Sequence, residues 1–208
     1  MKRALLLGDA LPEEAHSVGM LARVLEHVFD GLCSVETEEH YGALTLKQLH
    51  AFDLVINYAE LWDRKGTKEA AGSLAAYVAD GGNYLAVHNG LQNGGMFELD
   101  CLTGAHFLGW KEPCFLEYRK SGAEHPITAW FEPFHLAEDP MEIMLDPILA
   151  QQVLLEIPYG SVTLPAAWCH RYGWGKVLCL TPGHTMESFI PFLSKFLYRT
   201  GLWFLDRI

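Results

Sequence analysis

The chain has 208 residues, of which half are hydrophobic and a fifth are charged, and this composition is that of a globular protein rather than a disordered one. Its 26 acidic and 15 basic residues give a formal net charge of −11, which excludes nucleic acid and an anionic membrane surface as partners because both would repel it. The five cysteines are widely spaced and include no C-x-x-C pair, so the sequence predicts neither a disulfide framework nor a zinc knuckle.

The length favours one α/β domain over residues 1–208, with enough chain to bury a sizeable core. The apolar run at residues 4–7 is too short for a signal peptide, and no apolar run reaches the length of a membrane span. Together with the cysteine usage, these features predict a cytoplasmic protein.

Short apolar runs and amphipathic segments alternate over the first 90 residues. The runs predict buried strands, and the amphipathic segments predict helices because their apolar residues recur every three or four positions. The strands predicted in this way are residues 3–9, 52–58 and 84–87, with a weak strand at 33–36, and the predicted helices are residues 13–30, 45–51 and 67–80. This alternation is typical of a parallel sheet with right-handed crossovers.

Residues 94–165 depart from that rhythm, because they are rich in glycine, proline and aromatic side chains and contain only weak strands at 114–119 and 152–156. We interpret this stretch as an elaborated insertion, an antiparallel extension that lies over the sheet edge. Residues 175–180 return to the pattern of a core strand. The apolar spacing in residues 188–205 predicts a closing helix that packs on the sheet.

A histidine follows two of the predicted core strands. His88 comes directly after residues 84–87, and His184 comes after residues 177–180 and a Pro182-Gly183 turn. Ligands of open α/β sheets bind beyond the carboxyl ends of the strands, so the two imidazoles are candidates for one site. Each histidine could instead only satisfy loop carbonyl groups, and Glu187 could either orient His184 or interact with a helix dipole.

The strand, turn and predicted helix around His88 have the layout of a nucleophile elbow, but the elbow has no serine or cysteine. An imidazole at that position could act as a general base, a hydrogen-bond donor or a metal ligand. Dinucleotide, P-loop, zinc-protease and G-x-S-x-G motifs do not occur in the sequence.

Further candidates lie in the insertion. His106 is flanked by glycine, which would let a ligand approach the backbone, whereas His125-Pro126 reads as a turn. Glu138, Asp139 and Glu142 form an acidic group that is either part of a site or a solvated loop. The remaining histidines receive no role because they read as surface or helix-face residues: His16, His27, His40, His50, His135 and His170.

Several short segments together resemble the trehalose-utilisation (ThuA-like) family of the class I glutamine amidotransferase-like superfamily. They include the Gly-Gly run that ends at His88, Leu102-Thr103-Gly104-Ala105-His106-Phe107, His125-Pro126-Ile127, Pro165-Ala166-Ala167-Trp168, residues 172–177 and Gly183-His184. The resemblance implies a flavodoxin-like three-layer sandwich with a mostly parallel sheet. It also implies a link to sugar metabolism, with oxidised (3-keto) glycosides as the substrate class.

In amidotransferases of this superfamily the elbow carries a cysteine, and a His-Glu pair follows a late strand. Here the elbow position resembles His88, and His184 falls near the histidine of that pair. The resemblance therefore implies that glutamine hydrolysis is lost while the pocket is kept. Two departures from the family pattern argue against carrying over trehalose as the substrate: Trp110-Lys111 replaces a His-Pro pair, and Glu138-Asp139-Pro140-Met141 replaces an Asp-Glu-x-Tyr segment.

The first hypothesis is an enzyme that acts on a sugar or a sugar-derived small molecule. His88 and His184 would be catalytic acid–base groups or, with Asp139, ligands of a divalent metal. The residues expected to contact the substrate are Asn89, His106 and Trp110. A separation of more than about 8 Å between His88 and His184 would exclude a joint role.

The alternative hypothesis is a noncatalytic module that keeps the amidotransferase-like scaffold for binding or assembly. The aromatic residues of the insertion and the apolar helix predicted over residues 188–205 would then supply a surface for a homo-oligomer.

Overall fold

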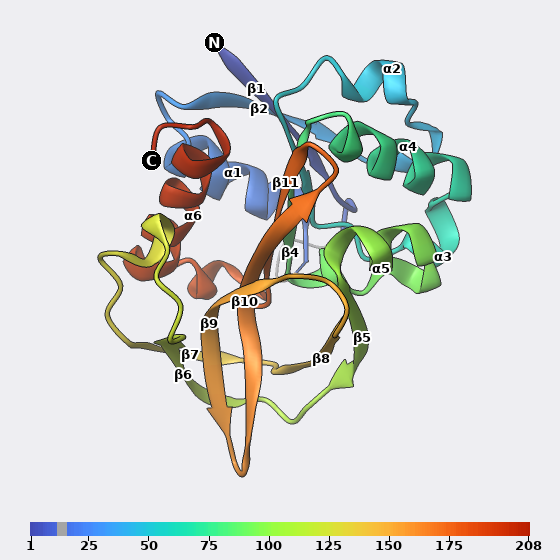
Figure 1. Cartoon of the computed structure of the whole chain (residues 1–208). Coiled ribbons are helices and arrows are strands. Elements are labelled where there is room, and N and C mark those ends of the chain that lie inside the picture. Colours follow the sequence, from blue (N-terminus) through green and yellow to red (C-terminus); the bar gives the residue numbers. More distant parts are fainter. Residues whose placement is uncertain (12–15) are drawn as a thin grey trace.

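A nine-stranded sheet runs through the protein in the computed structural model, which describes residues 1–11 and 16–208 (Figure 1). The strand order is β2-β1-β3-β4-β11-β10-β9-β6-β7. The first five strands in this order pair in parallel. They are β2 (Cys33–Glu38), β1 (Lys2–Leu7), β3 (Leu54–Asn57), β4 (Asn83–Val87) and β11 (Gly175–Leu180). The four strands predicted from apolar runs and the weak strand predicted at residues 33–36 therefore all belong to the parallel half.

The other four strands of the sheet pair antiparallel. They are β10 (Val162–Tyr172), β9 (Gln152–Tyr159), β6 (Cys114–Lys120) and β7 (Phe134–Glu138). A separate antiparallel pair consists of β5 (Ala105–Trp110) and β8 (Met141–Leu145). The large sheet is thus mixed, and the antiparallel strands continue it beyond β11 instead of lying over its edge as the sequence suggested.

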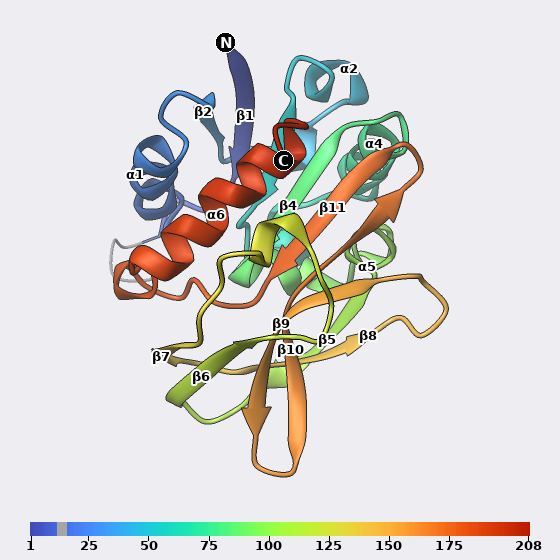
Figure 2. The same cartoon turned by 60° about the vertical axis from the view of Figure 1, so that its left-hand side comes forward.

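Helices cover both faces of the parallel half (Figure 2). One face carries α1 (Val18–Val28) and α6 (Pro191–Phe204), and the other carries α2 (Leu46–Leu49), α3 (Trp62–Lys65), α4 (Lys68–Ala79) and α5 (Phe97–Thr103). Successive strand side chains point to opposite faces, so Leu6 and Ile56 pack with α1 and α6, whereas Leu5 and Val55 pack with α4. Burial on both faces explains the continuous apolar runs.

The helix boundaries follow local capping chemistry. Thr45 forms a capping box with Gln48 at the start of α2, and the Thr67 hydroxyl accepts the Ala70 N–H at the start of α4. The helix predicted over residues 13–30 is described from Val18, and residues 13–15 of that prediction lie outside the described residues. The helix predicted from residue 188 starts at Pro191 because a 3-10 turn, Met186–Ser188, precedes it.

Four further 3-10 turns join these elements: Tyr41–Ala43, His88–Leu91, Asn93–Gly95 and Pro126–Thr128. The turn at His88–Leu91 follows β4 directly, in agreement with the strand and turn predicted there. None of the helices in the described part of the chain combines the length and apolar character required to cross a membrane.

Candidate functional site

Three histidines meet at the edge of the sheet where the parallel strands end. His16 lies in the connection from β1 to α1, His88 follows β4 and His184 follows the loop after β11. Because neighbouring parallel strands end at the same edge, these three segments converge although they are distant in the sequence. We call His16, His88 and His184 the histidine cluster, and we call this edge of the sheet the carboxyl edge.

The ring nitrogens of the histidine cluster are close enough to act together. His184 Nδ1 lies 3.0 Å from His16 Nε2 and 3.1 Å from His88 Nε2. One nitrogen from each of the three rings falls within 4.8 Å of the other two. The separation of His88 and His184 is therefore well inside the limit of about 8 Å for a joint role.

The outer hydrogen bonds of two rings determine where their protons lie. His88 Nδ1 is 2.6 Å from the Thr181 carbonyl oxygen, and His16 Nδ1 is 2.8 Å from Glu60 Oε2. Carbonyl and carboxylate oxygens accept hydrogen bonds, so both Nδ1 atoms carry hydrogen, and the Nε2 atom of such a ring presents a lone pair whenever the ring is neutral. Both lone pairs face His184 Nδ1, which can hold one hydrogen at most.

The backbone of the cluster is strained at two of its three histidines. His16 and His88 adopt φ angles of 57° and 46°, in the left-handed region that costs a non-glycine residue about 1–3 kcal/mol. The strain at His88 agrees with the predicted elbow, in which a sharp turn after a strand presents one side chain. Strain of this kind persists only where the surrounding structure enforces it.

His88 is fully buried, and burial determines its protonation state. Removal from water lowers the pKa of His88 to about 3, although the hydrogen bond with the Thr181 carbonyl acts in the opposite direction. The imidazole is therefore neutral at pH 7, and its Nε2 atom presents a lone pair that can accept a hydrogen bond or bind a cation.

A buried carboxylate, Asp9, organises the segment that holds His16. It follows β1 and accepts the Glu60 N–H at 2.8 Å and the Leu61 N–H at 3.1 Å. The Tyr41 hydroxyl donates to it at 3.1 Å, and Lys65 Nζ lies 2.7 Å away. Asp9 thus fixes the backbone of Glu60, and the Glu60 carboxylate in turn fixes the His16 ring.

A second buried carboxylate, Glu138, holds the loop that carries His184. Its Oε1 accepts the Gly183 N–H at 3.1 Å, and the Tyr58 hydroxyl donates to the Gly183 carbonyl at 2.7 Å. Burial raises the pKa of Glu138, and its Oε2 has no hydrogen-bond partner among the described residues. The solvated-loop alternative is therefore wrong for Glu138, whereas Glu142 is half-exposed and pairs with Lys111.

The other predicted site residues differ in their distance from the cluster. The Trp110 ring centre lies 5.1 Å from that of His88, and Asp139 Oδ2 lies 3.8 Å from His184 Nδ1. Asn89 is buried beside His88, where its amide donates to the Tyr58 carbonyl at 3.4 Å and its Oδ1 is unpartnered among the described residues.

Two predicted relationships are absent from the described contacts. The structure does not bring His106 into the histidine cluster, because its Nδ1 pairs with Asp100 at 3.0 Å. Glu187 does not orient His184, since its carboxylate accepts a hydrogen bond from the Thr185 hydroxyl at 2.7 Å.

His16 is the site residue that sequence reasoning missed. Its neighbours read as a helix face, and the sequence analysis therefore left it without a role. The signal that could have found it is its position in the connection that follows β1, since such connections meet other strand ends at the carboxyl edge.

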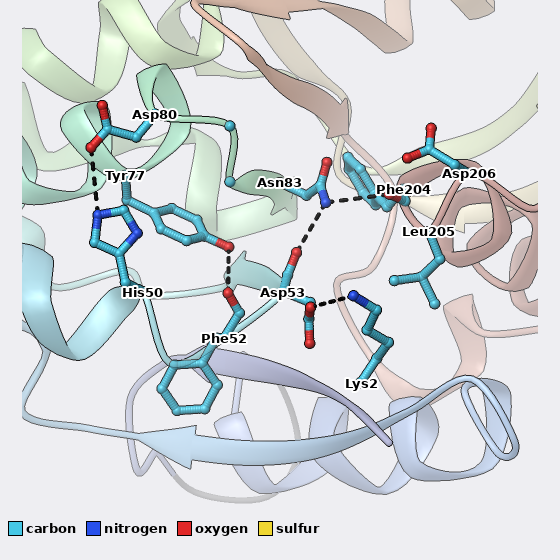
Figure 3. A pocket seen from close by; sticks show the side chains of 12 residues that line it. Lys2, His50, Phe52, Asp53, Tyr77, Asp80, Asn83, Phe204, Leu205 and Asp206 are labelled. Atoms are coloured by element: carbon cyan, nitrogen blue, oxygen red, sulfur yellow. Dashed lines mark hydrogen bonds and ion pairs between the residues drawn. The ribbon is translucent and has the colours of Figure 1, made fainter.

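A cavity of about 350 Å³ lies at the opposite edge of the sheet, where β1 and β4 begin (Figure 3). Its polar side chains bind one another: Lys2 Nζ lies 2.7 Å from Asp53 Oδ1, and His50 Nε2 lies 3.4 Å from Asp80 Oδ2. Asn83 donates to the carbonyl groups of Asp53 and Phe204. Acidic and basic side chains thus pair with one another at this edge, whereas three imidazole rings meet at the carboxyl edge.

The fold and the site define a mixed α/β protein with a histidine cluster at the carboxyl edge of its parallel strands. The family model for trehalose utilisation, ThuA, matches residues 12–204, and the chain belongs to this family. No curated protein sequence matches the chain.

Solved structures share the fold at low sequence identity. A ThuA-like protein from Bacteroides uniformis ATCC 8492 is 17% identical, with a TM-score of 0.78 and coverage of 99% of this chain and 92% of that chain. A ThuA-like protein from Parabacteroides merdae ATCC 43184 is 12% identical, with a TM-score of 0.76 and coverage of 98% and 89%. A β-galactosidase from Rahnella sp. R3 is 14% identical, with a TM-score of 0.71, and the match covers 100% of this chain and 32% of that one.

Proposed function

We propose that this ThuA-family protein is an enzyme that acts on a sugar or a sugar-derived small molecule at the histidine cluster. His88 and His184 are the proposed catalytic residues. The observation that carries the proposal is their contact: two imidazoles from separate strand ends lie 3.1 Å apart at the carboxyl edge, with one ring buried and the other partly exposed.

The chemistry proposed for the pair is general acid–base catalysis. The neutral His88 ring would accept a hydrogen bond at Nε2 from His184 Nδ1, 3.1 Å away, and so orient the His184 ring. His184 would exchange protons with substrate and solvent, because its side chain is 28% exposed. The elbow carries His88 in place of a nucleophilic cysteine, so glutamine hydrolysis through a thioester is not proposed. The strand order β2-β1-β3-β4-β11 supports the flavodoxin-like designation for the parallel half.

Trp110 is the proposed substrate-binding surface. It is 39% exposed and lies beside His88, and an exposed indole ring packs well against the apolar C–H face of a pyranose. Asn89 is proposed to contribute its unpartnered Oδ1. His106 stays a proposed substrate contact only through its place in β5, the strand that ends in Trp110. A 3-keto glycoside and a cytoplasmic location are proposed from the family resemblance and the composition.

The test is ligand binding to a panel of mono- and disaccharides and their 3-keto derivatives, measured by saturation-transfer NMR. We expect the wild type to bind at least one of them and Trp110→Ala to weaken that binding at least about tenfold, which corresponds to about 1.4 kcal/mol. Trp174→Ala is the matched control because Trp174 is 84% exposed and lies at the opposite edge, near Gly81. Equal binding by Trp110→Ala and the wild type, or no binding by the wild type, would contradict the proposal.

The alternative, a noncatalytic binding or assembly module, has one supporting observation. The same fold forms about a third of a β-galactosidase chain, so it occurs as one part of a larger sugar hydrolase. The apolar side chains of α6 give this alternative little support, since Leu193, Phe196 and Leu197 pack in the core of the chain itself. Sedimentation velocity at micromolar concentration separates a monomer from the homo-oligomer that an assembly role requires.

A further inference from the structure

We propose that His16, His88 and His184 form a binding site for a divalent transition metal of the Zn²⁺ type, with Nε2, Nε2 and Nδ1 as the ligand atoms. The inference goes beyond the proposed function at the same site: with an ion bound, His88 and His184 would be its ligands instead of acid–base groups. It does not depend on the identity of the substrate. It also changes the candidate ligand set, since His16 takes the place of Asp139.

The ring nitrogens of the histidine cluster have more lone pairs facing one another than hydrogens to share between them. When the rings of His16 and His88 are neutral, their hydrogen bonds with Glu60 and Thr181 place the hydrogen on Nδ1 and leave a lone pair on each Nε2 atom. Both face the single Nδ1 atom of His184 at 3.0 and 3.1 Å. With all three rings neutral, His184 has at most one hydrogen to give and is 3 Å from both acceptors. A cation between the three nitrogens would bind every lone pair.

Two of the three histidines have a hydrogen-bond acceptor at the ring nitrogen that faces away from the cluster. Metal-binding histidines usually donate their other N–H to a carboxylate or a backbone carbonyl, which fixes the ring and raises its basicity. His16 has the carboxylate of Glu60 as this partner, and His88 has the carbonyl of Thr181. Asp9 in turn holds Glu60 in place, because its carboxylate accepts the Glu60 N–H.

The distances between the ring nitrogens of the histidine cluster suit a Zn²⁺ ion. Zn²⁺ bonds to imidazole nitrogen are about 2.0–2.1 Å long, and tetrahedral geometry then places the ligand nitrogens about 3.3 Å apart. The distances from His184 Nδ1 to the other two ring nitrogens are 3.0 and 3.1 Å. These two distances would therefore need to lengthen by only a few tenths of an ångström to admit the ion, and the distance between the His16 and His88 nitrogens is at most 4.8 Å.

The histidine cluster is open to solvent on one side and has carboxylates beside it. The side chain of His16 is 16% exposed and that of His184 is 28% exposed, so the cluster is closed on the His88 side and reaches solvent on the other. Three protein ligands and one position open to water or substrate are the arrangement of catalytic zinc sites. Glu60 and Asp139 place negative charge next to the cluster, which favours a cation.

The experiment is titration of the chelator-treated full chain with Co²⁺, followed by visible spectroscopy, and with Zn²⁺, followed by calorimetry. We expect one ion per chain and the intense visible absorption of four-coordinate Co²⁺. His16→Asn and His184→Ala should each weaken Zn²⁺ binding by more than about 100-fold, because a ligand contributes more than an outer partner. Asparagine is chosen at His16 because it tolerates the left-handed backbone there.

Glu60→Gln is the most discriminating variant, since it touches no ligand atom and should still weaken binding by about 10–100-fold. His135→Ala is the control, because His135 lies on the surface of β7 and stacks on Phe115, and its binding should equal that of the wild type. Thermal unfolding without metal checks that each variant folds. The inference is overturned if His16→Asn keeps the affinity and the Co²⁺ spectrum of the wild type, or if the wild type binds no ion.

The metal assays contain no sugar, so their outcome is independent of the sugar-binding test. Sugar binding by a chain that binds no metal would remove this inference and leave the proposed function in place. Metal binding by a chain that binds no sugar would contradict the proposed function and leave this inference in place.

Discussion

The Nε2 atom of His88 and the Nδ1 atom of His184 lie 3.1 Å apart although 96 residues separate them in the sequence. Their strands, β4 and β11, are parallel neighbours in the sheet, with Val87 opposite Leu180. His88 follows its strand at once, and His184 follows after a loop held by Glu138 and Tyr58 through Gly183. The contact therefore depends on both the sheet register and that loop.

The strained backbone at His88 predicts an unusual order of stability among its variants. Both His88→Gly and His88→Ala remove the ring, but glycine accepts the φ of 46° without a steric penalty. We expect His88→Gly to be more stable than His88→Ala by about 1 kcal/mol in urea unfolding. The same pair of substitutions at His27, inside α1, should show the opposite order because glycine is a poor helix former. Equal stability of the two His88 variants would show that the strain does not exist in solution.

Gly183→Ala should disturb the loop that carries His184. A Cβ atom there would lie 3.1 Å from Val87 Cγ1 and 3.3 Å from Phe189 Cζ, and the φ of +134° disfavours any side chain. We expect a loss of about 1–3 kcal/mol in the free energy of unfolding, measured in urea. Gly122→Ala is the control, since a Cβ atom there meets nothing within 4 Å. A loss no larger than that of the control would contradict the argument.

Asp9→Asn should lower the stability of the fold and weaken Zn²⁺ binding, although Asp9 is not one of the proposed ligands. An amide at this position cannot accept from two N–H groups, the Tyr41 hydroxyl and Lys65 as the carboxylate does. We expect a loss of about 2 kcal/mol in stability and, through Glu60 and His16, weaker Zn²⁺ binding than in the wild type. Asp63→Asn is the control because Asp63 is 55% exposed. If Asp9→Asn loses stability but binds Zn²⁺ as the wild type does, Asp9 has no role in positioning the site.

Much of the parallel half could be predicted from the sequence, because β1, β3, β4 and β11 are buried on both faces and read as uninterrupted apolar runs. The edge strand β2 is half-buried to exposed and gives a weaker signal. The antiparallel strands were harder to place. In β7 the buried Phe134, Leu136 and Glu138 alternate with exposed residues, and a short alternating strand with a buried glutamate gives a weak signal. Their position beyond β11 depends on long-range pairing with β10, which no local pattern encodes.

The candidate site was predictable only where a histidine ends an apolar strand. His88 and His184 met that condition, whereas His16 follows β1 after a long connection. His106 lay outside that condition: Gly104 suggested the approach of a ligand, and the pairing of the His106 Nδ1 atom with Asp100 on α5 was not visible in the sequence. Which carboxylate reaches which imidazole is a property of tertiary packing.

His170 predicts part of the acid sensitivity of the fold. Burial lowers its pKa to about 4 from the ordinary value of 6.5, although the Leu102 carbonyl acts in the opposite direction. Between these values the unfolded chain binds more protons than the folded one, so the free energy of unfolding falls as pH falls through this window, by up to about 3 kcal/mol from this residue.

His170→Gln, which can still donate to the Leu102 carbonyl, should therefore lose less stability than the wild type between pH 7 and pH 4. Urea unfolding at several pH values measures the difference between the two proteins. Parallel stability curves for the variant and the wild type would show that His170 is not held neutral by the fold.

Metal addition should raise the stability of the apo chain if the histidine cluster binds an ion, because a ligand that binds only the folded state adds RT ln(1 + [L]/Kd) to the free energy of unfolding. At a free Zn²⁺ concentration of 100 times Kd this amounts to about 2.7 kcal/mol, or a rise of roughly 5–10 °C in Tm for a domain of this size. A chelator should reverse the rise, and His16→Asn should abolish it. Mg²⁺ at the same concentration should have little effect, since it prefers oxygen ligands to imidazole. An equal rise with Mg²⁺, or in the His16→Asn variant, would place the stabilising ion somewhere other than the three histidines.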